Sequence, residues 1–293
     1  MDGGIAVSVG AALVWGGYLF YLKRAFTDYP ASLLTVCINS FALVWYLPAF
    51  LAGIGPRAAG DALAAFGLAE LGVVALTATM VAAAMIAFLR ALAVGDVSYV
   101  APISKIVPVF VLPIEIVALG QVLTPLEVGG VVVATTAVYV ANFRGGALLD
   151  PLRRATTSTA ARLAILSAMA FAVSDVARRV ALQELAIPVG LWIPLLLGGV
   201  AVVLLPAAIR AETPATLRAD LPKFVAGGLF VAAGEGLTNV AFSLVPASIA
   251  SPIINTQAVV AVVLGGLLLD EEQFGIRLVA AGLAVIGVTM IAV

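Results

Sequence analysis

Ten long apolar stretches, each close to the length that a helix needs to cross a lipid bilayer, dominate this sequence of 293 residues. They span residues 5–25, 32–53, 63–92, 97–119, 125–142, 162–183, 189–209, 224–245, 247–269 and 276–293. A spanning helix takes about 20 mostly apolar residues. Backbone groups in hydrocarbon must bond within the segment, and the stretches lack the alternation of barrel strands. The expected fold class is therefore an all-α membrane protein with ten transmembrane helices.

The composition excludes several classes of protein. Hydrophobic residues make up 63% and charged residues 11%, against about 45–50% and 25% in soluble domains. A single cysteine, Cys37, excludes an internal disulfide, and the absence of histidine removes the commonest general base and metal ligand. The sequence has no P-loop, HExxH, GxSxG or CxxC motif. We therefore expect no enzyme activity, no cofactor, no metal site and no nucleic-acid partner.

The longest polar stretch, residues 144–162, lies at the middle of the chain. It contains paired glycines, paired arginines and a run of hydroxyl residues, which is typical of a linker. We expect a first five-helix repeat at 1–146, a linker at 147–160 and a second five-helix repeat at 161–293.

Positive charges are distributed unequally between the alternate loops. Odd-numbered loops hold eleven of them: Lys23, Arg24, Arg90, Arg144, Arg153, Arg154, Arg162, Arg210, Arg218, Lys223 and Arg277. The other side has Arg57, with Arg178 and Arg179 at the far end of the sixth stretch. Because cytoplasmic loops carry the excess of Lys and Arg, we predict a multi-pass bacterial inner-membrane protein with a cytoplasmic linker and both termini periplasmic or extracellular.

The two halves resemble each other. Ser98 matches Ser248, and Pro102 matches Pro252, at a spacing of 150 residues. Tandem repeats of five helices must insert with opposite orientations, which is the inverted-repeat plan of secondary transporters. That plan predicts a substrate site near the membrane midplane, between the repeats.

The segment from residue 239 to 293 resembles the closing signature of EamA-type members of the drug/metabolite transporter superfamily. The signature comprises Pro246-Ala247, Pro252 near the start of the next helix, three leucines, Glu271 or Glu272, and a glycine-rich last helix. The first half resembles it more weakly, with Gln121 at the acidic position, and Trp15-Gly16 also fits the family. The resemblance implies export of small metabolites. Among bacterial members we take the aromatic amino acid exporters (YddG-type) as the working subgroup, although no motif here singles that subgroup out.

Ionisable residues inside the apolar stretches are the first candidates for function, because a charge at the centre of a spanning helix costs about 2.5–3.5 kcal/mol or more. Glu235 lies near the middle of the eighth stretch and is expected to bind a proton, a cation or a substrate amine. Alternatively it is a neutral acid that hydrogen-bonds a neighbouring helix. Lys105 is expected to hold a substrate carboxylate, or else to snorkel or pair with a carboxylate such as Glu235. Asp175 and Arg178 are spaced i,i+3, which favours a structural pair near the outer surface.

Two proline-containing helices supply further candidates. Pro102 and Pro252 are expected to break their helices locally. The family resemblance implies that the polar residues after them line a central cavity: Ser104, Lys105, Asn255 and Gln257. The alternative for these side chains is hydrogen bonding between helices.

Aromatic side chains complete the expected cavity. Trp15 and Tyr18 share a helix face, and Tyr99 lies near the start of the fourth stretch, so these rings could stack on an apolar substrate. The alternative for them is the interfacial aromatic belt. Asn239, one helical turn after Glu235, completes the predicted set.

These features together predict a secondary transporter that exports small metabolites, above all amino acids, by alternating access. Two alternatives stay open: a proton-coupled multidrug exporter with Glu235 as the coupling acid, and a membrane-embedded lipid enzyme or non-transport subunit. The expected partners are a small-molecule substrate and the lipid bilayer, with a monomeric or homodimeric protein.

Overall fold

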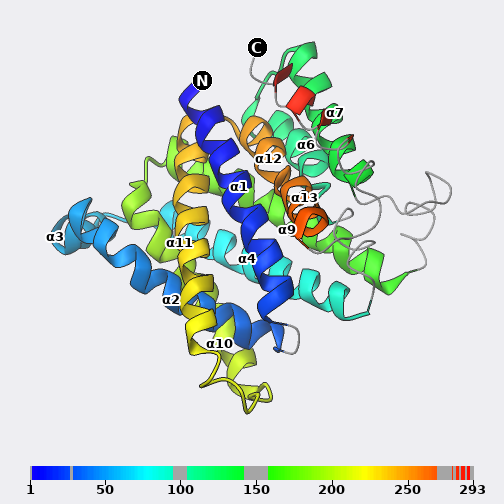
Figure 1. The fold of residues 1–293 in the computed structure, drawn as a ribbon. Coiled ribbons are helices and arrows are strands. Elements are labelled where there is room, and N and C mark those ends of the chain that lie inside the picture. The colour runs from blue at the N-terminus through cyan, green and yellow to red at the C-terminus, as the bar shows by residue number, and fades with distance from the viewer. Residues whose placement is uncertain are drawn as a thin grey trace.

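The computed structural model describes residues 2–26, 29–94, 104–141 and 158–268, with residues 279, 282–283, 285–287 and 289–290. Every regular element in them is a helix (Figure 1). The first half contains α1 (Asp2–Ala25), α2 (Ala31–Ala52), α3 (Gly55–Ala64), α4 (Leu68–Val94), α6 (Val107–Leu119) and α7 (Pro125–Ala141). The second contains α9 (Thr159–Arg179), its π-helical extension η1 (Val180–Glu184), α10 (Val189–Arg210), α11 (Leu221–Leu244), α12 (Ala247–Asn255) and α13 (Gln257–Leu268).

Six of the described helices are long and apolar enough to cross a membrane: α1, α2, α4, α9 with η1, α10 and α11. Shorter apolar helices, including α6 and α7, add to them. Many large apolar side chains point outward, among them Leu13, Val44 and Val202. In water such a surface would be costly, whereas lipid solvates it. The predicted all-α membrane fold is confirmed.

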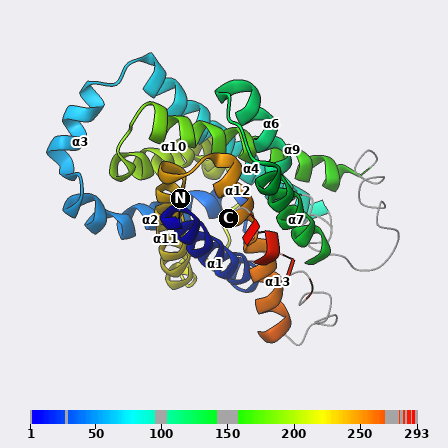
Figure 2. The same cartoon turned by 90° about the horizontal axis from the view of Figure 1, so that it is seen from above.

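One end of the helical bundle is defined by contacts around Val245. A Cβ atom at Gly4, in the first turn of α1, would lie only 2.6 Å from Val245 Cγ1. Gln183, at the end of α9 and η1, donates a hydrogen bond of 2.8 Å to the Val245 carbonyl. Since α1 begins where α9 and η1 end, the first helices of the two halves run in opposite directions. Figure 2 looks down on the molecule with this N-terminal end toward the viewer.

The equivalent stretches 97–119 and 247–269, which contain α6 and α12 respectively, show the same inversion. Glu115, one turn before the end of α6, contacts the first residues of α12 at this N-terminal end. Met290 also lies near it, since its Cε would be 3.0 Å from a Cβ at Gly129, close to the start of α7. These contacts confirm the prediction of inverted repeats.

The opposite end of the bundle holds a polar cluster. Tyr29 donates a hydrogen bond of 2.6 Å to Asp220, which also accepts one of 2.7 Å from Lys223. Tyr21 donates to the backbone carbonyl of Lys223 at 2.9 Å. The cluster joins the end of α1 to the start of α11.

The third predicted stretch, residues 63–92, is wrong at its beginning. The structure has a separate helix, α3, after a turn in which Gly55 has φ +68°, a conformation that favours glycine. The spanning helix α4 begins only at Leu68. Because α3 carries Arg57 and Asp61 among small residues, it is too polar and too short to span.

Both proline-containing segments are interrupted at equivalent positions. In the second half the helix breaks at Thr256, between α12 and α13. Thr256 uses its hydroxyl and its backbone N–H on the same acceptor, the Ile253 carbonyl, which tightens the last turn. In the first half a turn at Lys105 and Ile106 precedes α6, and Ile106 lies 150 residues before Thr256. Pro252 itself lies inside α12, so the break comes four residues later than predicted.

Candidate functional site

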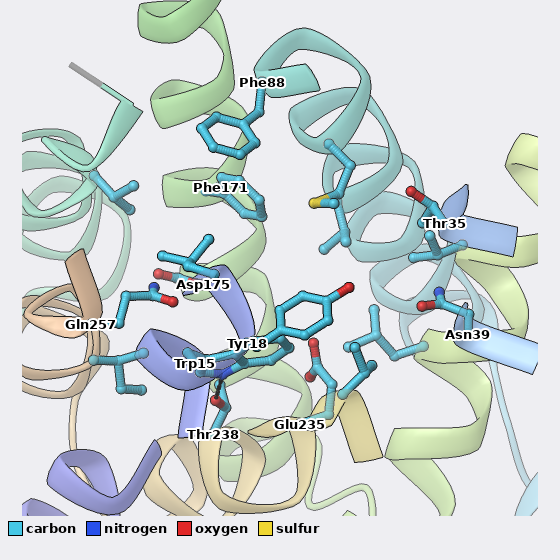
Figure 3. A pocket seen from close by; sticks show the side chains of 18 of the residues that line it. Trp15, Tyr18, Thr35, Asn39, Phe88, Phe171, Asp175, Glu235, Thr238 and Gln257 are labelled. Atoms are coloured by element: carbon cyan, nitrogen blue, oxygen red, sulfur yellow. Dashed lines mark hydrogen bonds between the residues drawn. The ribbon is translucent and has the colours of Figure 1, made fainter. Parts of the chain in front are cut away.

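A central cavity of about 160 Å³ lies between the two halves (Figure 3). Its walls come from α1, α2, α4 and the start of α6 in the first half, with the turn that precedes α6, and from α9, α10, α11, α12 and α13 in the second. Most of the lining side chains are aliphatic or aromatic, and a few are charged or amide groups. This mixture is typical of binding sites for small molecules.

The structure brings most of the predicted site residues together. Six of them line this one cavity: Trp15, Tyr18, Lys105, Glu235, Asn255 and Gln257. Ser104 is buried beside it with 1% exposure but does not line it. Tyr99 and Pro102 lie outside the described residues. That the cavity binds substrate stays a prediction.

Glu235 is paired with an arginine and an asparagine. Its Oε2 accepts hydrogen bonds of 2.8 Å from Arg178 Nη1 and 2.9 Å from Asn239 Nδ2. Asn239 in turn accepts a bond of 2.9 Å from the Trp192 indole N–H. Asn239 therefore orients Glu235 from behind the cavity wall and does not line the cavity. The i,i+4 bond from Asn239 to the Glu235 carbonyl, 2.7 Å long, fixes the amide further.

One predicted charge pair and one alternative pairing are wrong. Arg178 is 4% exposed and pairs with Glu235, not with Asp175 near the outer surface. Lys105 is not the partner of Glu235. The spacing along α9 does place Asp175 and Arg178 near each other, but the Arg178 guanidinium forms its ion pair with Glu235 on α11.

Asp175 faces the cavity, which the sequence analysis did not predict. Its Oδ2 accepts one hydrogen bond of 2.7 Å, from the Ser251 hydroxyl on α12. Ser251 also accepts a bond of 3.2 Å from Asn255 Nδ2. A hydrogen-bonded chain thus runs from the Asp175 carboxylate to the last residue before the break at Thr256. An aspartate inside an apolar stretch was the signal that could have identified it.

Lys105 is held by aromatic rings. Its Nζ lies 5.8 Å from the ring centroid of Phe88 and 5.6 Å from that of Phe171, within the range of cation–π attraction. The ammonium has no hydrogen bond or ion pair with any described residue, and it attracts Asp175 through space. Its N–H donors are therefore available to a ligand in the cavity.

Trp15 reaches the cavity because α11 has a glycine opposite it. A Cβ at Gly234 would lie 2.7 Å from Trp15 Cε2, so the indole packs directly on the backbone of α11. The indole N–H donates a 2.9 Å bond to the Thr238 hydroxyl, and the ring meets Tyr18 edge-on at 5.5 Å between centroids. These contacts fix a rigid aromatic wall beside Glu235 (Figure 3).

A second buried polar cluster lies at the N-terminal end, and it was not predicted from the sequence. Glu115 is fully buried, and its two oxygens accept the backbone N–H groups of Ala247 at 2.8 Å and Ser248 at 2.7 Å. Arg179 Nε lies 3.4 Å from Glu115 Oε1. A carboxylate at a helix N-terminus satisfies its free N–H groups and its positive dipole. A glutamate within the apolar run 107–119 was the signal that could have revealed this contact.

Comparison with known proteins identifies the family. The family model described as EamA-like transporter family matches residues 2–143 and again 158–293. A search of curated proteins gives no match. One crystal structure of a protein superposes with a TM-score of 0.78 at 15% identity, covering 99% of this chain and 98% of that chain. At that identity the likeness shows the fold alone.

The two family matches together cover nearly all of the chain, and each covers one half of the inverted bundle. That family consists of transporters and not of enzymes. This chain belongs to the EamA-like transporter family, within the drug/metabolite transporter superfamily, and is a multi-pass secondary transporter of small molecules.

Proposed function

We propose that this transporter exports amino acids, aromatic ones among them, by alternating access. The observation that carries the proposal is the presence of Lys105 and Asp175, from opposite halves of the chain, in one cavity with aromatic walls. An amino acid has one group for each of these charges and an apolar side chain for the rings. The YddG-type aromatic amino acid exporters remain the working subgroup on this ground.

The balance of charges favours a zwitterion over a cationic drug. Two cations, Lys105 and Arg178, and two carboxylates, Asp175 and Glu235, line the described part of the cavity. Arg178 and Glu235 neutralise each other at 2.8 Å. The remaining pair is complementary to a ligand with both an ammonium and a carboxylate, whereas a cationic drug would leave the Lys105 ammonium uncompensated.

The polar cluster at Glu115 supports alternating access. It joins α6, the end of α9 and the start of α12 at the N-terminal end. The cavity extends from Trp15 toward Leu22 and Leu89, which lie near the opposite end of α1 and α4. We propose that this conformation is closed at the N-terminal end, and that the two halves rock about the cavity to open it.

We also propose an orientation, based on the unequal distribution of Lys and Arg. The end of the bundle that holds Arg24, Arg210 and Lys223 would face the cytoplasm of a bacterial inner membrane. Both termini would then lie outside the cytoplasm, with the linker at 147–160 inside. The two repeats would comprise residues 1–146 and 161–293, in a monomer or a homodimer.

Counterflow in proteoliposomes at equal pH on both sides tests the proposed substrate. Vesicles loaded with unlabelled amino acid are expected to accumulate external radiolabelled L-phenylalanine transiently. A panel of amino acids, nucleosides and cationic drugs then competes for exchange. Exchange of cationic drugs without any exchange of amino acids would overturn the proposal in favour of a multidrug exporter.

A further inference from the structure

The two carboxylates of the cavity are compensated very differently. Glu235 is 8% exposed and accepts charged or amide donors from Arg178 and Asn239. Asp175 is half-buried and accepts one hydrogen bond, from the Ser251 hydroxyl. No described residue forms an ion pair with it. One neutral hydrogen bond is far less than a carboxylate receives from water.

The surroundings of Asp175 supply no cation of its own. Arg178, one turn along α9, attracts Asp175 through space, but its ion pair is with Glu235, which repels Asp175. Lys105 attracts it through space while its Nζ lies over two phenyl rings. The helix α1 adds the neutral hydroxyl of Tyr18, and α4 and α10 present only apolar side chains to the cavity. The Asp175 carboxylate can therefore accept one more positively charged partner.

We propose that Asp175 holds a proton when the cavity is empty and exchanges that proton for the ammonium group of the amino acid. An ionised carboxylate within a membrane-spanning helix is costly unless a positive charge accompanies it. A proton and a substrate ammonium both supply that charge, and they compete for the same oxygens. The inference rests on the proposed function, because it names the amine of an amino acid.

The exchange balances in protons and charge. On the side where substrate enters, the O–H bond of Asp175 breaks, and its proton passes to water as the ammonium takes its place. On the other side the amino acid leaves, and a proton from that side bonds to the Asp175 oxygen. One zwitterion with no net charge moves outward as one proton moves inward, so each cycle carries one positive charge across the membrane.

Ser251 and Asn255 connect this exchange to the helix break. Ser251 donates to Asp175, and Asn255 donates to both the hydroxyl and the carbonyl of Ser251, at 3.2 Å and 2.8 Å. Asn255 immediately precedes the break at Thr256. A change of occupant at Asp175 therefore acts directly on the junction between α12 and α13.

Proton release on binding is the first test. Purified wild-type protein in weakly buffered detergent solution receives L-phenylalanine, and a pH indicator reports the protons that appear. We expect release approaching one proton per bound amino acid. The apparent Kd should rise about tenfold for each unit that the pH falls below the range in which Asp175 titrates. Binding with no proton release and no pH dependence would overturn the inference.

Variants assign the proton to a residue. Asp175→Asn should bind without proton release, and Asp175→Glu should restore the release. Asp61→Asn, on the exposed helix α3, is the matched control and should behave as wild type. If Asp175→Asn binds too weakly to measure, the pH dependence of the wild type and of Asp175→Glu decides. Release that is kept by Asp175→Asn and lost in Glu235→Gln would move the site to Glu235 and overturn the assignment.

Transport separates this inference from the proposed function. Counterflow at equal pH needs no coupling, whereas accumulation against a concentration gradient does. In wild-type vesicles an imposed pH gradient should drive L-phenylalanine accumulation, and a membrane potential should change its rate. Counterflow without response to either gradient would refute proton exchange and keep amino acid transport. Failure of every amino acid in counterflow would refute the proposed function, and the exchange with it.

Discussion

Arg178 Nη1 lies 2.8 Å from Glu235 Oε2, and this ion pair joins α9 to α11 at the wall of the central cavity. Both side chains are nearly buried, and Arg178 Nε has no hydrogen-bond partner among the described residues. Removing the carboxylate would leave a buried guanidinium without its counter-charge. Substitutions in this pair therefore test how much the contact between α9 and α11 stabilises the second half.

We expect Glu235→Leu to lower the free energy of unfolding by about 3–5 kcal/mol, the usual cost of removing one partner from a buried pair. The double variant Arg178→Met with Glu235→Leu should recover most of that loss, because no charge is left uncompensated. Thermal unfolding in detergent measures both. A double variant as unstable as the sum of the single ones would show that the pair does not act as a unit.

Two neighbouring glycines on α11 should respond in opposite ways to the same change. In Gly234→Ala the new Cβ would lie 2.7 Å from Trp15 Cε2, so the indole must move and its hydrogen bond to Thr238 must weaken. At Gly236 a Cβ would meet nothing within 4 Å. We expect Gly234→Ala to reduce L-phenylalanine counterflow severalfold, while Gly236→Ala transports as wild type. Equal activity of the two variants would separate the Trp15 wall from transport.

Lys105→Met should weaken binding of amino acids more than it changes the fold. The Nζ donors of Lys105 have no partner among the described residues, and methionine keeps most of the apolar contact with Phe88 and Phe171. Loss of a hydrogen bond to a charged group costs about 1.5–3 kcal/mol, or roughly tenfold to a hundredfold in affinity. Counterflow at a range of L-phenylalanine concentrations gives the apparent KM. The control is Arg57→Met on the exposed helix α3, and an unchanged KM for Lys105→Met would contradict a carboxylate contact.

Glu115→Gln should loosen the start of α12. The carboxylate accepts two backbone N–H groups, from Ala247 and Ser248, and an amide offers only one oxygen in that position. An unsatisfied buried N–H costs about 1–3 kcal/mol, and thermal unfolding should report a loss of that size. Glu184→Gln removes a carboxylate whose side chain is 53% exposed and which lies 3.5 Å from Arg179. It should cost less than about 1 kcal/mol, and equal losses would argue against the helix-capping role of Glu115.

Asp220 should give the stability a measurable dependence on acid pH. Hydrogen bonds from Lys223, Tyr29 and Thr216 lower the pKa of its carboxyl group to about 2. Because the pKa is lower in the folded than in the unfolded protein, its stabilising contribution is present above the unfolded value of about 3.9 and is lost as the pH falls through about 2. The Tm difference between wild type and Asp220→Asn should therefore be constant from pH 7 to about pH 5 and shrink toward pH 2. A difference that persists at pH 2 would exclude this charge as its cause. Asp61→Asn is the control, because no described residue bonds to that side chain.

The depth of a polar residue in an apolar stretch proved a good guide to the cavity. Lys105, Glu235, Asn255 and Gln257 were predicted from depth and from the repeat, and all four line it. The depth of these residues did not predict which charges pair. Glu115 and Asp175 also lie within apolar stretches, but Glu115 was passed over and Asp175 was assigned to the surface.

The sequence by itself determined the all-helical membrane fold, the division into two halves and the family, because apolar stretches of spanning length can be satisfied in hydrocarbon only as helices. The tertiary structure alone decided which charges meet. Arg178 and Glu235 are 57 residues apart, and Glu115 and Ala247 are 132 apart. A spanning helix is apolar on all sides, so its sequence does not reveal which face turns inward. Helix rotation and the breaks before α6 and at Thr256 are set by packing between helices, which is why the pairing of each buried charge was decided only in the folded protein.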